Sequence, residues 1–154
     1  MCLKKKIKIF LLDMNFRIAI PTYKRQNTLG QKTLKTLEQH NFTKDIIDIF
    51  VNNQEEYEIY KPLYPEYNII VGVTGIKEIR EFIFNYYNDG DLILCIDDDV
   101  TSFKKKNGNK LVDVDNLREC FERGFELCKK NNTCLFGIYP CDNAMFMSDI
   151  IINT

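Results

Sequence analysis

Four short apolar runs divide the chain. Each is five or six residues long and rich in isoleucine, valine or leucine, which is the pattern of strands buried in a sheet. The runs cover residues 16–21, 46–51, 68–73 and 92–96. The last of them is apolar at every position, which predicts a central strand covered on both faces.

Helical periodicity fills the segments between these runs. In residues 27–39, Leu29, Thr33 and Leu37 recur four residues apart and define one face of a helix. Residues 54–60 are expected to form a short second helix. A third helix begins after Gly75, and its apolar face is expected to consist of Ile76, Ile79, Ile83, Tyr86 and Tyr87.

The C-terminal third of the chain predicts a hairpin and a last helix. The hairpin covers Lys104–Lys110, with Asn107-Gly108 at its turn. Asp113 or Asp115 can cap the helix that follows, and Asn131 suits the left-handed residue at its end.

Strands that alternate with helices predict an α/β fold, with a mostly parallel, Rossmann-like sheet flanked by helices. One further strand is expected at residues 135–139. In such sheets, ligands bind at the carboxyl ends of the strands. Polar clusters follow four of the predicted strands, at residues 22–25, 52–54, 75–80 and 97–99. The sequence therefore predicts a polar site at one edge of the sheet.

Composition and charge exclude several classes of protein. The 154 residues are 45% hydrophobic and 28% charged with a net charge of −1, which fits one globular domain without a general attraction for nucleic acid. No apolar run approaches the roughly 20 residues of a membrane-spanning helix. Residues 1–13 are basic and then briefly apolar, which predicts a leader or an extra strand before a domain of residues 14–154.

The cysteines and the single histidine narrow the chemistry. The six cysteines include no C-x-x-C pair, and Cys95 lies within an apolar run, so we expect reduced, buried thiols in a cytoplasmic protein. Because His40 is the only histidine, Ser–His and Cys–His catalysis are disfavoured.

Three consecutive aspartates follow the fourth apolar run. Like charges this close need a counter-ion, and carboxylates of this kind suit Mg²⁺ or Mn²⁺ shared with substrate phosphates. Since side chains alternate along a strand, Asp97 and Asp99 are expected to point the same way and hold the metal, with Asp98 facing elsewhere. A solvated acidic turn is the alternative interpretation.

Other polar residues near these strand ends have two interpretations each. Arg80 lies one turn into the third helix, where it can reach a phosphate or remain a surface arginine. Thr22 and Tyr23 can hold a nucleobase or form an ordinary turn. Lys104–Lys106 forms a solvated hairpin tip or contacts an anionic acceptor.

Taken together, these motifs resemble the metal-dependent glycosyltransferases of the GT-A fold. The similarity extends to short phage and algal-virus enzymes, including those associated with TET/JBP-type hydroxylases that glycosylate hydroxylated DNA bases. The residues that carry it are Ile18–Arg25 (IAIPTYKR), Gly75–Ile83 (GIKEIREFI), Leu92–Asp99 (LILCIDDD), and Phe136–Pro140 (FGIYP) followed by Asn143 and Phe146-Met147.

The resemblance implies a function and a set of site residues. It implies transfer of a sugar from a nucleotide-diphosphate sugar, UDP-linked above all, to a glycan or a hydroxylated DNA base, with Mn²⁺ or Mg²⁺ as cofactor, in the cytoplasm of a host cell if the protein is viral. The implied nucleotide-sugar-binding residues are Thr22, Tyr23, Arg25, Asn53, Arg80, Asp97 and Asp98. The implied metal ligands are Asp97 and Asp99.

Length and motif content leave two other functions open. GT-A enzymes usually continue for about 100 residues beyond the nucleotide half, so this chain is expected to be truncated at its C-terminus, and no catalytic base can be named. The first alternative function is therefore that of a non-catalytic nucleotide-sugar-binding fragment or remnant. Asp97–Thr101 also satisfies D-x-D-x-T, the first motif of haloacid-dehalogenase-type phosphatases, in which the first aspartate is a nucleophile.

Overall fold

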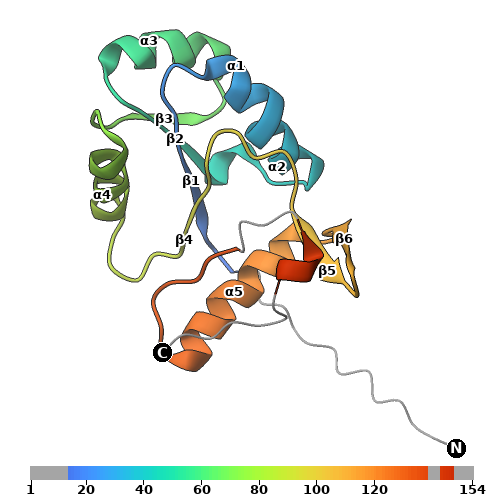
Figure 1. Ribbon diagram of the computed structural model, residues 1–154. Helices are drawn as coiled ribbons and strands as arrows, with labels where there is room; N and C mark the ends of the chain where they lie inside the picture. Colours follow the sequence, from blue (N-terminus) through green and yellow to red (C-terminus); the bar gives the residue numbers. More distant parts are fainter. Residues whose placement is uncertain (1–13, 139–142, 148–154) are drawn as a thin grey trace, which may run out of the picture.

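The computed structural model describes residues 14–138 and 143–147, and these form an α/β fold (Figure 1). Four parallel strands make one sheet in the order β3-β2-β1-β4. The strands are β1 (Arg17–Pro21), β2 (Ile47–Val51), β3 (Asn68–Val71) and β4 (Ile93–Cys95). A separate hairpin pairs β5 (Lys104–Asn107) with β6 (Lys110–Asp113). The prediction of an α/β fold with a mostly parallel sheet is confirmed.

The predicted first helix is a continuous helical segment of three parts. It comprises α1 (Gln26–Leu29), the π-helical η1 (Gly30–Leu34) and α2 (Lys35–Gln39). Short 3₁₀ turns are η2 (Lys44–Ile46) and η3 (Ala144–Phe146). The remaining helices are α3 (Gln54–Leu63), α4 (Ile76–Tyr86) and α5 (Leu117–Asn131).

Helices cover both faces of the sheet. On one face, Ile79 and Ile83 of α4 pack against Ala19 and Phe50. The larger core lies on the other face, where the segment α1–α2 and α5 cover the strands, so α4 stands apart from the other helices (Figure 1). The buried residues of this larger core include Ile18, Ile20, Leu29, Leu37, Ile49 and Phe121. This arrangement follows from the alternation of side chains along each strand.

A buried carboxylate joins the first three strands near their amino ends. Asp48 of β2 has no exposed surface and accepts hydrogen bonds from the Arg17 guanidinium, from the Asn68 amide at 2.6 Å and from the Tyr87 hydroxyl at 2.7 Å. We refer to Arg17, Asp48, Asn68 and Tyr87 as the Asp48 cluster. Burial, followed by the Asp48 carboxylate, raises the pKa of Tyr87 well above its usual range. The hydroxyl therefore remains a proton donor to Asp48 at any ordinary pH.

Two expectations about strands were wrong. In the sheet formed by the described residues, β4 lies at the edge, although Ile93 and Leu94 do pack against the cores on opposite faces. An apolar run indicates that other residues cover both faces of a strand. It does not indicate that the strand pairs with another strand along both of its edges. Residues 135–138 form no strand, and Leu135 is 75% exposed. Only Phe136 of this stretch packs inward, edge-to-face against Phe125.

Smaller corrections concern helix ends and cysteines. Asn116, not Asp113 or Asp115, caps α5 by accepting from the Glu119 N–H, and Asn132, one residue beyond the expected position, is left-handed. The hairpin turn is likewise shifted by one residue, because Asn107 pairs with Lys110. Of the four described cysteines, all free, three are exposed and Cys128 is half-buried, so the expectation of buried thiols was wrong. The proposed leader, residues 1–13, lies outside the described residues.

Candidate functional site

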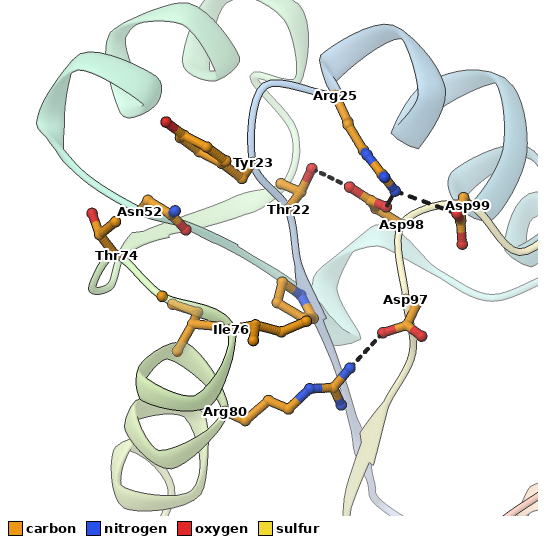
Figure 2. Close-up of a pocket in the computed structure, with 13 residues that line it drawn as sticks. Thr22, Tyr23, Arg25, Asn52, Thr74, Ile76, Arg80, Asp97, Asp98 and Asp99 are labelled. Atoms are coloured by element: carbon orange, nitrogen blue, oxygen red, sulfur yellow. Dashed lines mark hydrogen bonds and ion pairs between the residues drawn. The ribbon is translucent and has the colours of Figure 1, made fainter.

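A cavity of about 510 Å³ opens at the carboxyl ends of the strands. This volume is within the usual range for a small-molecule site. Its walls come from the ends of β1, β2 and β4 and from the start of α4, as Figure 2 shows. The lining residues are Pro21, Thr22, Tyr23, Arg25, Asn52, Thr74, Gly75, Ile76, Ile79, Arg80, Asp97, Asp98 and Asp99. The predicted convergence of strand ends on one polar site is thus present in the structure.

A chain of hydrogen bonds fixes the central aspartate. The Thr22 hydroxyl donates to Asp98 Oδ2 at 2.7 Å, and it lies 3.0 Å from the Tyr60 hydroxyl. Because the single proton of Thr22 is used on Asp98, Tyr60 must donate to Thr22. The Tyr60 oxygen in turn accepts from the Arg25 backbone N–H at 3.1 Å. Both hydroxyls in this series of hydrogen bonds, those of Thr22 and Tyr60, therefore have partners, as buried polar groups require.

Two arginines pair with the three aspartates from two sides. Arg25 lies 3.1 Å from Asp98 and 3.3 Å from Asp99, whereas Arg80 reaches across from α4 to Asp97 at 2.8 Å (Figure 2). The hydrogen bond between Arg25 and Asp98, followed by the negative charges of Asp98 and Asp99, raises the pKa of Arg25. The cavity wall thus carries both negative and positive groups, and Arg25, Arg80, Asp97 and Asp99 remain accessible to a ligand.

The expected orientation of the aspartates was only partly correct. Asp97 and Asp99 do not share a partner, because Asp97 pairs with Arg80, whereas Asp99 shares Arg25 with Asp98. The period-two rule fails here because β4 ends at Cys95, and residues 98–99 already belong to a turn. Asp98 is the buried member, with 6% of its surface exposed, and Asp97 and Asp99 are the accessible ones.

The loop after β1 is held in an unusual conformation. Lys24 adopts a left-handed backbone with φ of 54°, which few residues other than glycine adopt. Its N–H donates to the buried carboxylate of Glu56 at 2.9 Å, in the first turn of α3. This contact stabilises the strained residue and places Tyr23 and Arg25 on the rim of the cavity. A smaller hollow of about 290 Å³ lies on the α3 side of the same loop.

Seven of the eight residues predicted for the site line the cavity. They are Thr22, Tyr23, Arg25, Arg80, Asp97, Asp98 and Asp99. Asn53 does not, because its side chain caps α3 by accepting from the Glu56 N–H at 2.9 Å. Its neighbour Asn52 lines the cavity instead. Asn53 with Glu56 three residues later has the spacing of a helix start, and this signal distinguishes the cap from the site residue.

Sequence reasoning also missed Thr74 and Ile76 as individual lining residues. Gly75 between them has φ of 114°, a conformation that other residues rarely adopt. It turns the chain from β3 into α4 and brings Ile76, which is 78% exposed, to the cavity. The amphipathic pattern had placed Ile76 on the buried face of α4, and this expectation was wrong because Ile76 is the first residue of the helix.

The cavity offers few protein ligands for a metal ion. Among the described residues, no group of three or more His, Cys, Asp or Glu side chains could hold a metal ion. Asp97 and Asp99 each use one oxygen in an ion pair, and in the described part of the chain their other oxygens make no hydrogen bond. Two accessible carboxylates of this kind suit Mg²⁺ or Mn²⁺ held mainly by substrate phosphates and water.

Comparisons with known proteins do not assign this chain to a family. No family model, no curated protein and no solved structure matches it. None of the helices in residues 14–138 and 143–147 is long and apolar enough to cross a membrane.

Proposed function

We propose that the chain binds a nucleotide-diphosphate sugar together with Mn²⁺ or Mg²⁺ and transfers the sugar, as a glycosyltransferase of the GT-A type. The single observation that carries the proposal is the cavity in which three aspartates and two arginines meet at the carboxyl edge of a parallel sheet. A diphosphate with a divalent cation carries both signs of charge, and this cavity offers partners for each.

The residues have distinct roles in this proposal. Asp97 and Asp99 would hold the metal, which supplies positive charge to the diphosphate as it leaves. Arg80, displaced from Asp97, and Arg25, displaced from Asp99 but still paired with Asp98, would bind phosphate oxygens. Tyr23, which is 46% exposed, offers a flat ring to the nucleobase, and Asn52 and Thr74 offer polar groups beside it. Asp98 stays bound to Thr22 and orients Arg25.

Transfer would break the bond between the anomeric carbon and the phosphate oxygen and form one to an acceptor hydroxyl, whose proton is lost. The proposed donor is a UDP-sugar, and the proposed acceptor is a glycan or a hydroxylated DNA base. Asp142, the carboxylate that follows the expected last strand, lies outside the described residues, so no base is assigned.

Calorimetry tests the binding part of the proposal. UDP and UDP-sugars are titrated into the protein in Mn²⁺, in Mg²⁺ and in EDTA. We expect much tighter binding with metal, and we expect Asp99→Asn to abolish the difference. Asp113→Asn, an exposed aspartate of β6 outside the cavity, is the matched control and should bind like the wild type. Equal affinity with and without metal would contradict the proposal.

Turnover separates the proposed enzyme from its alternatives. Labelled UDP-sugars are offered with glycan and hydroxymethylated-DNA acceptors. Transfer at roughly 1 s⁻¹ or faster is enzymatic. Binding with slow hydrolysis and no transfer identifies a nucleotide-sugar-binding fragment. A beryllofluoride adduct on Asp97, which mimics an aspartyl-phosphate, would instead identify the phosphatase and refute the proposal.

A further inference from the structure

Thr33 interrupts an otherwise apolar helix face. Leu29, one helical turn earlier, and Leu37, one turn later, are completely buried in the larger core, and Thr33 is only 1% exposed. A buried hydroxyl without a partner destabilises a protein relative to an apolar side chain of the same shape. Packing alone would therefore favour valine at this position, and the hydroxyl needs another explanation.

The hydroxyl bridges the two ends of the turn that carries the carboxylates. Thr33 Oγ1 donates to the backbone carbonyl of Asp97 at 2.8 Å and accepts from the backbone N–H of Val100 at 2.9 Å. Both its donor and its acceptor capacity are used on residues 64 and 67 positions away in the sequence. The side chain is thus a strut between the helix and the turn at residues 97–100.

The surrounding helix is shaped for this contact. Thr33 lies in the π-helical segment η1, and such wide turns occur mostly as single irregularities, often at functional sites. One turn further on, the Thr36 hydroxyl donates to the carbonyl of Val100 at 3.2 Å. Two hydroxyls of one helical segment therefore hold one turn, and Thr33 is the one that contacts both of its ends.

We propose that Thr33 is a positioning residue of the site, whose hydroxyl fixes the turn Asp97–Val100 and with it the directions of the Asp97 and Asp99 carboxylates. What the turn binds rests on the proposed function, whereas how it is held does not. Valine at position 33 would keep the shape but leave the Asp97 carbonyl and the Val100 N–H without this partner. Serine would keep the hydroxyl.

Amide hydrogen exchange, read residue by residue by NMR, tests how the turn is held. In Thr33→Val we expect the Val100 amide to exchange at least about tenfold faster, the factor that corresponds to one buried hydrogen bond. Thr33→Ser should retain protection. Thr36→Val is the matched control, because the Thr36 hydroxyl donates to the Val100 carbonyl and not to its N–H, so its loss should leave this amide protected. If Thr33→Val does not fold, Thr33→Ala removes the same hydroxyl.

Affinity for UDP in Mn²⁺ tests what the turn does. We expect about a tenfold loss in Thr33→Val and near-wild-type affinity in Thr33→Ser. Unchanged Val100 protection in Thr33→Val, equal acceleration in Thr36→Val, or a serine variant as impaired as valine would overturn the inference. If the wild type binds no UDP with metal, the proposed function fails, and hydrogen exchange alone decides the role of Thr33.

Discussion

Replacing Asp48 by asparagine should destabilise the fold by about 3 kcal/mol. The carboxylate is fully buried and binds three side chains, from β1, from β3 and from the residue after α4. Removing one partner of a buried ion pair costs about 3–5 kcal/mol. We expect the lower end of this range, because the Arg17 side chain is 39% exposed and can regain part of its hydration. The amide of asparagine also places a donor among three existing donors.

Urea unfolding followed by far-ultraviolet circular dichroism measures this loss. For a domain of this size, about 3 kcal/mol corresponds to a fall in Tm of roughly 6–12 °C. Asp113→Asn makes the same chemical change on an exposed strand and should shift stability by less than about 0.5 kcal/mol. The double variant Arg17→Met with Asp48→Asn should be more stable than the sum of the single losses predicts. A loss below about 1 kcal/mol for Asp48→Asn would refute this account of the Asp48 cluster.

Three further substitutions probe the site and the core. Arg80→Ala should weaken metal-dependent UDP binding by about 1.5–3 kcal/mol. Tm should change little, because the ion pair of Arg80 with Asp97 is exposed. Unchanged calorimetric affinity would show that Arg80 is a surface residue that does not contact the nucleotide. Tyr60→Phe should weaken the same binding, whereas Tyr64→Phe, whose hydroxyl donates to α1, should affect stability alone; equal affinities in the two variants would contradict the relay through Thr22. Gly124→Ala should lower unfolding free energy by about 1–3 kcal/mol, because its Cβ would lie 2.4 Å from the Phe136 ring, and a neutral result would show that this contact is loose.

Apolar patterning predicted the strands well because burial on two faces leaves a direct signature in the sequence. It did not identify β4 as an edge strand, since edge position depends on which segments pair and not on composition. Residues 135–138 show the reverse failure: they have the composition of a strand, yet only Phe136 is partly buried against the core. Local composition cannot supply a pairing partner.

The site was predicted by topology more than by individual residues. Parallel strands bring their carboxyl ends together, so the residues that follow β1 and β4 had to meet. The choice between Asn52 and Asn53 depended on one backbone step at the start of α3, and the orientation of Asp98 depended on where β4 stops. Thr33 was recognised as part of a helix face, but its contact with a turn more than sixty residues away leaves no periodic signal.

The strand order also determines when the site can form during folding. Thr22 and Asp98, which hydrogen-bond in the finished site, are separated by 76 residues, so closing that loop costs chain entropy that only later contacts can offset. β1, β2 and β3 can pair while β4 is still absent. A chain that ends before Leu92 would therefore contain β1, β2 and β3 without any carboxylate turn. The Asp98 and Asp99 carboxylates therefore meet Arg25 only when β4 docks beside β1, whereas Asp97 lies 17 residues from Arg80 and can pair with it locally.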